Sequence, residues 1–383
     1  MLIVKEGKPK YMQVMEYLRF QIDEGDLKPG DKLPSQGFLR KKYGFTQSTI
    51  ERAHELLEKD GYVERFERKG IFVTPPEKRK HEAAVGLMNR SVLILADNGN
   101  AKHEHHKQTG WSDYLMRGAV NEVLEQSRNV MSMAPLDLKS SDIEYWTKHP
   151  PLGLVMIGEP VSTPLMLEIA HRLQALKTPV VVYGNAPELK GFDRVISDHE
   201  QGNYELTRWL LERGCRCILP MRGESGEAYW IPMRERGYER ALHEANVAPM
   251  SPCIFPQYLR SEDSHEHFDN AVKVVAQSLG DYIERNGSID AIMAVTDGAI
   301  NVLAGACRSL GLEPNRDVIF VGYDHYWEDV EERKFEQTKP LATIDKRNVE
   351  MGAQMVQLLS ERIAGEVDDA PQCRKVAPQL LTY

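Results

Sequence analysis

The sequence predicts an α/β protein in which a small helical head precedes a larger body of two lobes, each with a parallel sheet. Between residues 11 and 74, three amphipathic segments precede two short strand-like runs with a basic turn between them. From about residue 90 onward, short continuous apolar runs alternate with amphipathic segments, the pattern of parallel strands covered by helices on both faces. The body is longer than one such sheet usually needs, so two lobes with a cleft between them are expected.

The composition of the 383 residues restricts the class of protein. No apolar run is long enough to span a bilayer, and the first residues lack a secretory signal pattern. The five cysteines are scattered, which favours reduced thiols in a cytoplasm. The net charge of −9 hides a net basic segment in the first 80 residues and a strongly acidic remainder. This distribution is expected of a protein whose head alone contacts a polyanion.

An apolar face predicts the first helix of the head, and an N-cap residue predicts the second. One helix is expected over residues 11–24, where four apolar side chains recur on one face, namely Tyr11, Met15, Leu18 and Ile22. Gly25 ends this helix. Ser35 is a typical N-cap for a short second helix over residues 36–42.

The third helix and the ribbon complete the head. Gly44 supplies a tight turn, and Thr46 caps a helix that reaches to about Lys59, with three side chains facing inward, namely Ile50, Ala53 and Leu57. Two strands follow at residues 62–66 and 70–74. Three helices and a two-stranded ribbon form a winged helix-turn-helix, whose third helix would lie in the major groove of duplex DNA.

The side chains expected to contact DNA lie at the start of the third helix, at the end of the second and in the wing. Gln47 matches adenine in a bidentate contact, and Ser and Thr hydroxyls reach bases or phosphates. The predicted DNA-binding set is Ser35, Lys41, Lys42, Thr46, Gln47, Ser48, Thr49, Arg52, Arg68, Lys69 and Gly70. For each of these residues taken singly, a solvated surface position is the alternative.

This head resembles the winged helix-turn-helix of the GntR family of bacterial regulators. The resemblance rests on Gly25–Ser35 (GDLKPGDKLPS), on Tyr43–Val63 and on Lys69–Val73. Three positions where the family carries arginine, or glycine in the wing, hold other residues here, namely Gly37, Gln47 with Glu51, and Arg68. Because arginine is the common reader of guanine, a variant operator is expected, read through Gln47 and Arg52.

The body follows a linker marked by Pro75-Pro76 and a charged run. The predicted domains are residues 1–74, a linker over 75–89 and the body over 90–383. Strands are expected at residues 91–96, 153–158, 179–184, 194–198, 217–221, 291–295 and 318–324. Helices are expected at residues 114–126, 164–176, 201–212, 232–245 and 301–310.

The body resembles the effector-binding domain of LacI-type regulators, which shares its fold with periplasmic sugar-binding proteins. The resemblance runs from about Ser91 to Gly365 and is carried by Gly110–Leu124, Arg194–Met221, Pro232–Leu242 and Ile289–Asp329, followed by PLATIDKRNVEMG. It implies an effector site in the cleft between the lobes. The residues that it implies are Trp111, Asn185, Arg234, Tyr258 and Asp297, with Arg234 and Asp297 as the paired polar contacts and Trp111 as an aromatic cover.

Each of these residues has a structural alternative. Arg234 lies in an Arg/Glu-rich helix start and would suit a surface position. Asp297 would suit a helix N-cap, Trp111 a core position and Asn185 a turn. Asp324, at the end of an apolar run, is expected at the hinge between the lobes and not on the ligand.

Together the two resemblances imply a ligand-responsive transcription repressor of the arabinose-repressor type. It would bind operator DNA as a homodimer and a sugar or related small polar effector in the cleft, with no cofactor and no metal. The alternatives are a carbohydrate-binding protein without a DNA role and an enzyme, but nucleotide-binding and nucleophile motifs are absent from the sequence. The histidines of KHEHHK (residues 102–107) are expected to be solvated.

Overall fold

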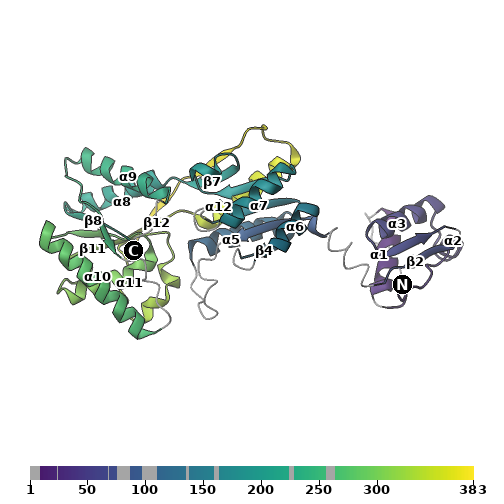
Figure 1. Ribbon diagram of the computed structural model, residues 1–383, viewed down its shortest axis with the longest axis horizontal. Coiled ribbons are helices and arrows are strands. Elements are labelled where there is room, and N and C mark those ends of the chain that lie inside the picture. Colours follow the sequence, from purple (N-terminus) through teal and green to yellow (C-terminus); the bar gives the residue numbers. More distant parts are fainter. Residues whose placement is uncertain are drawn as a thin grey trace. The chain divides into compact units, whose positions relative to one another are not determined.

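The computed structural model describes residues 9–23, 25–67, 69–75, 87–96, 110–134, 138–158, 164–223, 228–255 and 264–383. The chain divides into two compact units, Met1–Arg90 and Ser91–Tyr383 (Figure 1). Within the described ranges, no helix has both the length and the apolar character needed to cross a membrane.

The first unit is the predicted winged helix-turn-helix. Its helices are α1 (Lys10–Asp23), α2 (Gln36–Tyr43) and α3 (Gln47–Lys59), and its antiparallel ribbon consists of β1 (Val63–Phe66) and β2 (Gly70–Val73). Ser35 and Thr46 cap α2 and α3 as predicted, since their hydroxyls accept hydrogen bonds from the backbone nitrogens of Phe38 and Thr49. The capping oxygens satisfy helix N–H groups that have no partner within the helix.

The core of this unit corrects the predicted face of α1. Leu18 and Ile22 are buried as expected, but Val14 replaces Tyr11 and Met15 as the third fully buried apolar side chain. Positions 14, 18 and 22 lie four residues apart and form a single stripe, while positions 11 and 15 flank it. The stripe packs against Leu39 and against the three predicted inward residues of α3, Ile50, Ala53 and Leu57.

The second unit contains two six-stranded sheets, which define an N-lobe and a C-lobe. The N-lobe sheet has the order β13-β7-β6-β5-β3-β4, and the C-lobe sheet the order β14-β12-β11-β10-β8-β9. The N-lobe strands are β3 (Ser91–Ala96), β4 (Asn129–Met133), β5 (Gly153–Ile157), β6 (Val180–Tyr183), β7 (Asp193–Ser197) and β13 (Cys373–Val376). The C-lobe strands are β8 (Ile218–Gly223), β9 (Cys253–Phe255), β10 (Ala291–Met293), β11 (Ile319–Tyr323), β12 (Ala342–Asp345) and β14 (Gln379–Thr382). Neighbouring strands are parallel, as predicted, except that β14 runs antiparallel to β12.

Helices pack against both sheets. In the N-lobe they are α5 (Trp111–Glu125), α6 (Ser140–Lys148), α7 (Pro164–Ala175) and α12 (Asn348–Ala364), and in the C-lobe α8 (His199–Glu212), α9 (Trp230–Glu244), α10 (His265–Asn286) and α11 (Ile300–Ser309). The chain passes between the lobes three times, after β7, after β12 and between β13 and β14. The first two crossings place α8 and α12 in the lobe opposite the strand that precedes each of them.

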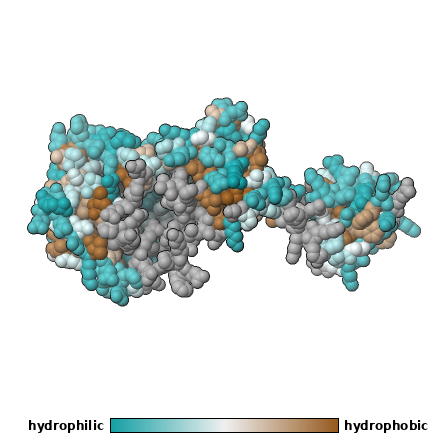
Figure 2. All heavy atoms as spheres, viewed as in Figure 1, coloured by the Kyte–Doolittle hydropathy of each residue, from teal (hydrophilic) through white to brown (hydrophobic). Residues whose placement is uncertain are grey.

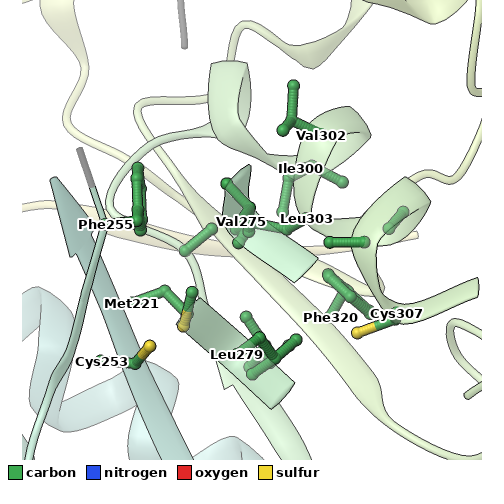
Figure 3. Close-up of a cluster of buried hydrophobic side chains, with 14 of the residues drawn as sticks. Met221, Cys253, Phe255, Val275, Leu279, Ile300, Val302, Leu303, Cys307 and Phe320 are labelled. Carbon is green, nitrogen blue, oxygen red and sulfur yellow. The ribbon is translucent and has the colours of Figure 1, made fainter. Parts of the chain in front are cut away.

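The C-lobe core gathers side chains from β8, β9, β11, α10 and α11. Figure 3 shows these side chains converging, among them Met221, Cys253, Leu279 and Phe320. Elsewhere the helices approach each other through glycine. A Cβ on Gly352 of α12 would lie 2.0 Å from the Leu115 carbonyl oxygen of α5, and one on Gly237 of α9 would lie 2.0 Å from the Glu200 carbonyl oxygen of α8. On the face that Figure 2 shows, hydrophilic residues cover most of both units between smaller apolar patches.

Candidate DNA-reading face and interlobe site

At the start of α3, three hydroxyl side chains form hydrogen bonds with one another, and one amide side chain is exposed. The hydroxyl of Thr46 bonds that of Thr49 at 2.7 Å and that of Ser48 at 3.2 Å, so these three oxygens stabilise the helix start. Gln47 is exposed at the first position of α3. Of the predicted readers in this turn, Gln47 is therefore the side chain that the fold leaves most available.

In the next turn of α3, Arg52 is exposed and remains a predicted DNA contact, but it also meets a ring of the first helix. The guanidinium carbon of Arg52 lies 4.6 Å from the ring centroid of Tyr11 in α1, which directs it toward the first helix. Glu51 accepts hydrogen bonds from Gln36 of α2 and, at 2.8 Å, from Arg65 of β1. Arg65 also pairs with Glu58 at 3.2 Å. Arg65 was not among the predicted residues, because nothing in the sequence shows that the wing folds back onto α3.

The basic side chains of this face come from α2, the wing and the loop before α2. Lys41 is exposed, and Lys42 lies over the rings of Phe38 and Tyr43. Lys69 is exposed in the wing turn, and Arg68 lies outside the described residues. Gly70 has φ of +115°, and a Cβ there would meet Lys32 Cε at 2.5 Å. Lys32 thus joins the wing, an association that the sequence did not suggest.

At the second lobe crossing, Lys346 forms an ion pair with Asp324, with 2.8 Å between Nζ and Oδ1 and side chains 4% and 5% exposed. Lys346 Nζ also lies 4.7 Å from the Trp111 ring centroid and donates to the Tyr183 hydroxyl at 3.5 Å. Trp111 and Tyr183 belong to the N-lobe, whereas Asp324 follows β11 of the C-lobe. Lys346 therefore connects both lobes, which agrees with the hinge position expected for Asp324.

Arg234 is buried on α9 and stacked between aromatic rings. It is 9% exposed, and its guanidinium carbon lies 3.5 Å from the Tyr323 ring centroid and 4.4 Å from that of Trp230. Its Nη1 donates to the Val295 carbonyl oxygen at 2.6 Å. Arg234 also lines a pocket bounded by β8, β10 and α9. The surface alternative for Arg234 is therefore incorrect.

His199 begins α8 directly after the first crossing and is 1% exposed. Its ring stacks on Tyr323 with centroids 6.0 Å apart. Burial lowers the pKa of His199 well below its ordinary value, and the positive charges of Arg234 and Lys346 lower it further. The imidazole is therefore neutral at pH 7. His199 could not be predicted as a site residue, since a histidine at a helix start carries no local signal of its burial.

Asp297 is fully buried, and its carboxylate contacts protein groups on both oxygens. Oδ1 accepts from the Thr343 hydroxyl at 2.7 Å, and Oδ2 accepts from the Tyr326 backbone nitrogen at 3.0 Å. Burial raises the pKa of Asp297 to about 7. The N-cap alternative is not observed, because a 3₁₀ turn over residues 297–299 precedes α11 and the Asp297 side chain holds the Tyr326 turn instead.

The remaining predicted effector residues are dispersed. The Trp111 ring lies 5.1 Å from that of Tyr183, close to Lys346. Asn185 accepts a hydrogen bond from Arg194 Nε at 3.2 Å, within the N-lobe. Tyr258 lies outside the described residues, as do the histidines of residues 102–107. The arrangement thus brings Trp111 and Arg234 to the lobe crossings and leaves Asp297 enclosed within the C-lobe.

Comparisons with known proteins relate segments of both units to known domain families. Residues 10–73 match the model of the bacterial regulatory proteins of the gntR family, and residues 207–382 match that of the periplasmic binding protein-like domain. The chain therefore joins a GntR-type helix-turn-helix domain to a periplasmic-binding-protein-like domain.

Among curated relatives, the arabinose metabolism transcriptional repressor of Geobacillus stearothermophilus is 24% identical over 377 residues, 94% of each chain. The transcriptional repressor PurR of Histophilus somni (strain 129Pt) is 26% identical over 203 residues, 53% of this chain and 56% of that one.

Solved structures share the fold. The complex of the transcriptional regulator CelR with cellobiose has a TM-score of 0.59 at 19% identity and covers 90% of this chain and 92% of its own. A LacI family regulator from Enterococcus faecium with bound ribose has a TM-score of 0.55 at 17% identity and covers 76% and 97%.

Proposed function

We propose that this chain is a ligand-responsive transcription repressor that reads operator DNA with residues 1–74 and binds a sugar or related small polar effector between the lobes of residues 90–383. Residues 75–89 would link the two parts, and the active form would be a homodimer working in the cytoplasm. The observation that carries the proposal is the union of a winged helix-turn-helix and a two-lobed binding fold in one chain.

The head supports sequence-selective binding through α3. Gln47 is free to contact a base edge in the major groove, while Lys41, Lys42 and Lys69 are exposed to contact phosphates, with Arg68 expected to join them in the wing. Two copies of the head in a dimer would read two half-sites whose spacing is set by the dimer.

The body supports effector binding at the lobe crossings. Arg234 would grip the effector from the C-lobe, and Trp111 would cover its apolar face from the N-lobe. Asn185 and Tyr258 remain proposed contacts, whereas Asp297 would act indirectly by holding the Tyr326 turn. Because the effector would bind one lobe arrangement more tightly than another, it would shift the population of DNA-binding dimers.

A mobility-shift experiment tests this function. The full chain is mixed with fragments of its own genome at low ionic strength, and retained fragments are sequenced. A shared pair of half-sites, with retardation that weakens steeply as salt increases, is the expected result. Failure to retard any duplex would favour the alternative of a carbohydrate-binding protein without a DNA role.

A further inference from the structure

Of the charged groups that the structure describes around the Tyr323 ring, Arg234 alone lacks an ion-pair partner. Four charged groups act on this ring, namely Arg234, Lys346, Asp324 and Asp198. Asp324 pairs with Lys346 at 2.8 Å, and Asp198 pairs with Lys375 at 2.9 Å. Among the described residues, Arg234 has no carboxylate within ion-pair distance.

The sequence neighbour of Arg234 does not provide its counter-charge. Glu235 is committed to Arg222, with 2.7 Å between their charged atoms. Arg234 is left with one carbonyl oxygen, that of Val295, and the faces of two aromatic rings. Its Nε is buried and has no acceptor among the residues that the structure describes. A buried guanidinium without an anion is costly, and rings and one carbonyl offset only part of that cost.

Other polar atoms close to Arg234 also lack partners. Both ring nitrogens of His199 and the hydroxyl of Tyr323 are buried and form no hydrogen bond within the described part of the chain. Burial is the main reason for the low pKa of the His199 imidazole, and the positive charges of Arg234 and Lys346 lower it further. Unpartnered buried polar groups of this kind in a native fold call for a missing partner.

A pocket lies next to this cluster. Its walls are mainly apolar, and the charged groups on them are Arg234 and the ion pair of Arg222 with Glu235. Arg234 is thus the one charged lining residue that has no ion-pair partner among the described residues. An apolar enclosure strengthens the attraction between a guanidinium and an anion. Arginine binds carboxylate and phosphate oxygens through paired N–H donors.

We propose that the effector carries an oxyanion, either a carboxylate or a phosphate, that pairs with Arg234, so that the ligand class is sugar acids or sugar phosphates and not neutral sugars. The inference rests on the proposed function, since it assumes that the effector binds at the lobe crossings.

The first test needs no ligand and compares two methionine variants of the full chain by thermal unfolding. Lys346→Met leaves Asp324 buried without its partner, so its Tm should fall clearly below that of the wild type. Arg234→Met removes an uncompensated charge, so its Tm should equal or exceed the wild-type value. A fall in the Arg234→Met variant as large as that of Lys346→Met would mean that the protein itself neutralises Arg234, and the proposal would be wrong.

The second test uses matched ligands at equal ionic strength, namely glucose, glucuronate and glucose 6-phosphate, with arabinose as a further neutral sugar. Glucuronate, glucose 6-phosphate or both should raise the wild-type Tm more than either neutral sugar, and the two anions separate the carboxylate from the phosphate source. The shift should vanish in Arg234→Met and persist in Arg236→Met. Arg236 is a suitable control because it lies on the same helix, is exposed and pairs with Glu200.

The outcomes separate this inference from the proposed function. A neutral sugar that shifts the wild type as strongly as the anions overturns the ligand class but leaves a ligand-responsive repressor in place. If none of the four ligands raises the Tm of the wild type, the ligand-free comparison of Arg234→Met with Lys346→Met decides whether Arg234 lacks a counter-charge. Loss of DNA retardation by the wild type contradicts the proposed function and not the charge argument.

Discussion

Lys346 and Asp324 form a buried ion pair that ties the end of β11 to the second lobe crossing. Asp324 adopts φ of +87°, in the left-handed region that non-glycine residues seldom occupy. Strain of this kind persists only where the surroundings hold it in place. Two contacts of the Asp324 side chain provide that support here. Oδ1 pairs with Lys346, and Oδ2 accepts a hydrogen bond from the Thr296 hydroxyl at 3.1 Å.

Removing only one partner of this ion pair should strongly destabilise the fold. Lys346→Met should lower the free energy of unfolding by about 3–5 kcal/mol, because the carboxylate stays buried and loses its counter-charge. The double variant Lys346→Met/Asp324→Asn should recover much of that loss. Urea unfolding followed by tryptophan fluorescence measures both. As a control, Lys375→Met removes the half-exposed partner of Asp198 and should cost less than about 1 kcal/mol.

The contact between α5 and α12 should tolerate no side chain at Gly352. A Cβ there would lie 2.0 Å from the Leu115 carbonyl oxygen and 2.8 Å from the Ala119 nitrogen, and backbone atoms cannot rotate away. Gly352→Ala should therefore force the helices apart and destabilise the body by roughly 1–3 kcal/mol. Gly191→Ala, at a position with open space and no positive φ, should leave the urea midpoint unchanged. An unchanged midpoint in Gly352→Ala would show that the helices separate at little cost.

Acid should weaken the head through His54. This side chain is buried on α3, and burial lowers its pKa, with Arg65 acting in the same direction and Glu51 and Glu58 opposing. Because the folded pKa lies below the unfolded one, unfolding takes up a proton, and stability is lost as the pH falls below about 6.5. Hydrogen exchange of the α3 amides should therefore show less protection at pH 5.5 than at pH 8, after correction for intrinsic rates. His54→Leu should abolish this difference, and a difference of equal size in that variant would assign the effect to other groups.

The features that could be predicted from sequence are those with local signals. Ser35 and Thr46 are capping residues recognisable from their neighbours, and runs such as 92–96 and 153–157 are apolar throughout because both faces of a parallel strand are buried. The 22-residue helix α10 was missed, since β9 before it has only three residues and its own sequence is rich in charged and polar side chains. β13 and β14 were missed for a similar reason, because they are short edge strands with partly exposed side chains.

The interlobe cluster could not be read from the sequence at all. His199, Arg234, Tyr323 and Lys346 are far apart along the chain and meet only because it crosses between the lobes after β7 and again after β12. The resemblance suggested Arg234, Trp111 and Asp297 as ligand contacts, and for Arg234 and Trp111 this stays a prediction. Asp297 is instead buried, and its oxygens accept hydrogen bonds from Thr343 and from the Tyr326 backbone. No spacing in the sequence reveals these partners.

The operator should be read mainly through Gln47. This side chain is exposed at the first position of α3, whereas the guanidinium of Arg52 lies against the Tyr11 ring. Gln47→Ala should weaken binding to the best site by about 1–3 kcal/mol and relax the preference at one base pair of each half-site. Arg52→Ala should cost less binding free energy than Gln47→Ala at that base pair, because the Arg52 guanidinium would first have to leave Tyr11.

Lys69→Ala should weaken binding to all sequences alike and reduce the dependence of the binding constant on salt, as expected for a phosphate contact. Selection of binding sites from random duplexes with each variant measures these effects. A site preference that changes in Arg52→Ala and not in Gln47→Ala would reverse the assignment and show that Arg52 leaves Tyr11 when the head enters the groove.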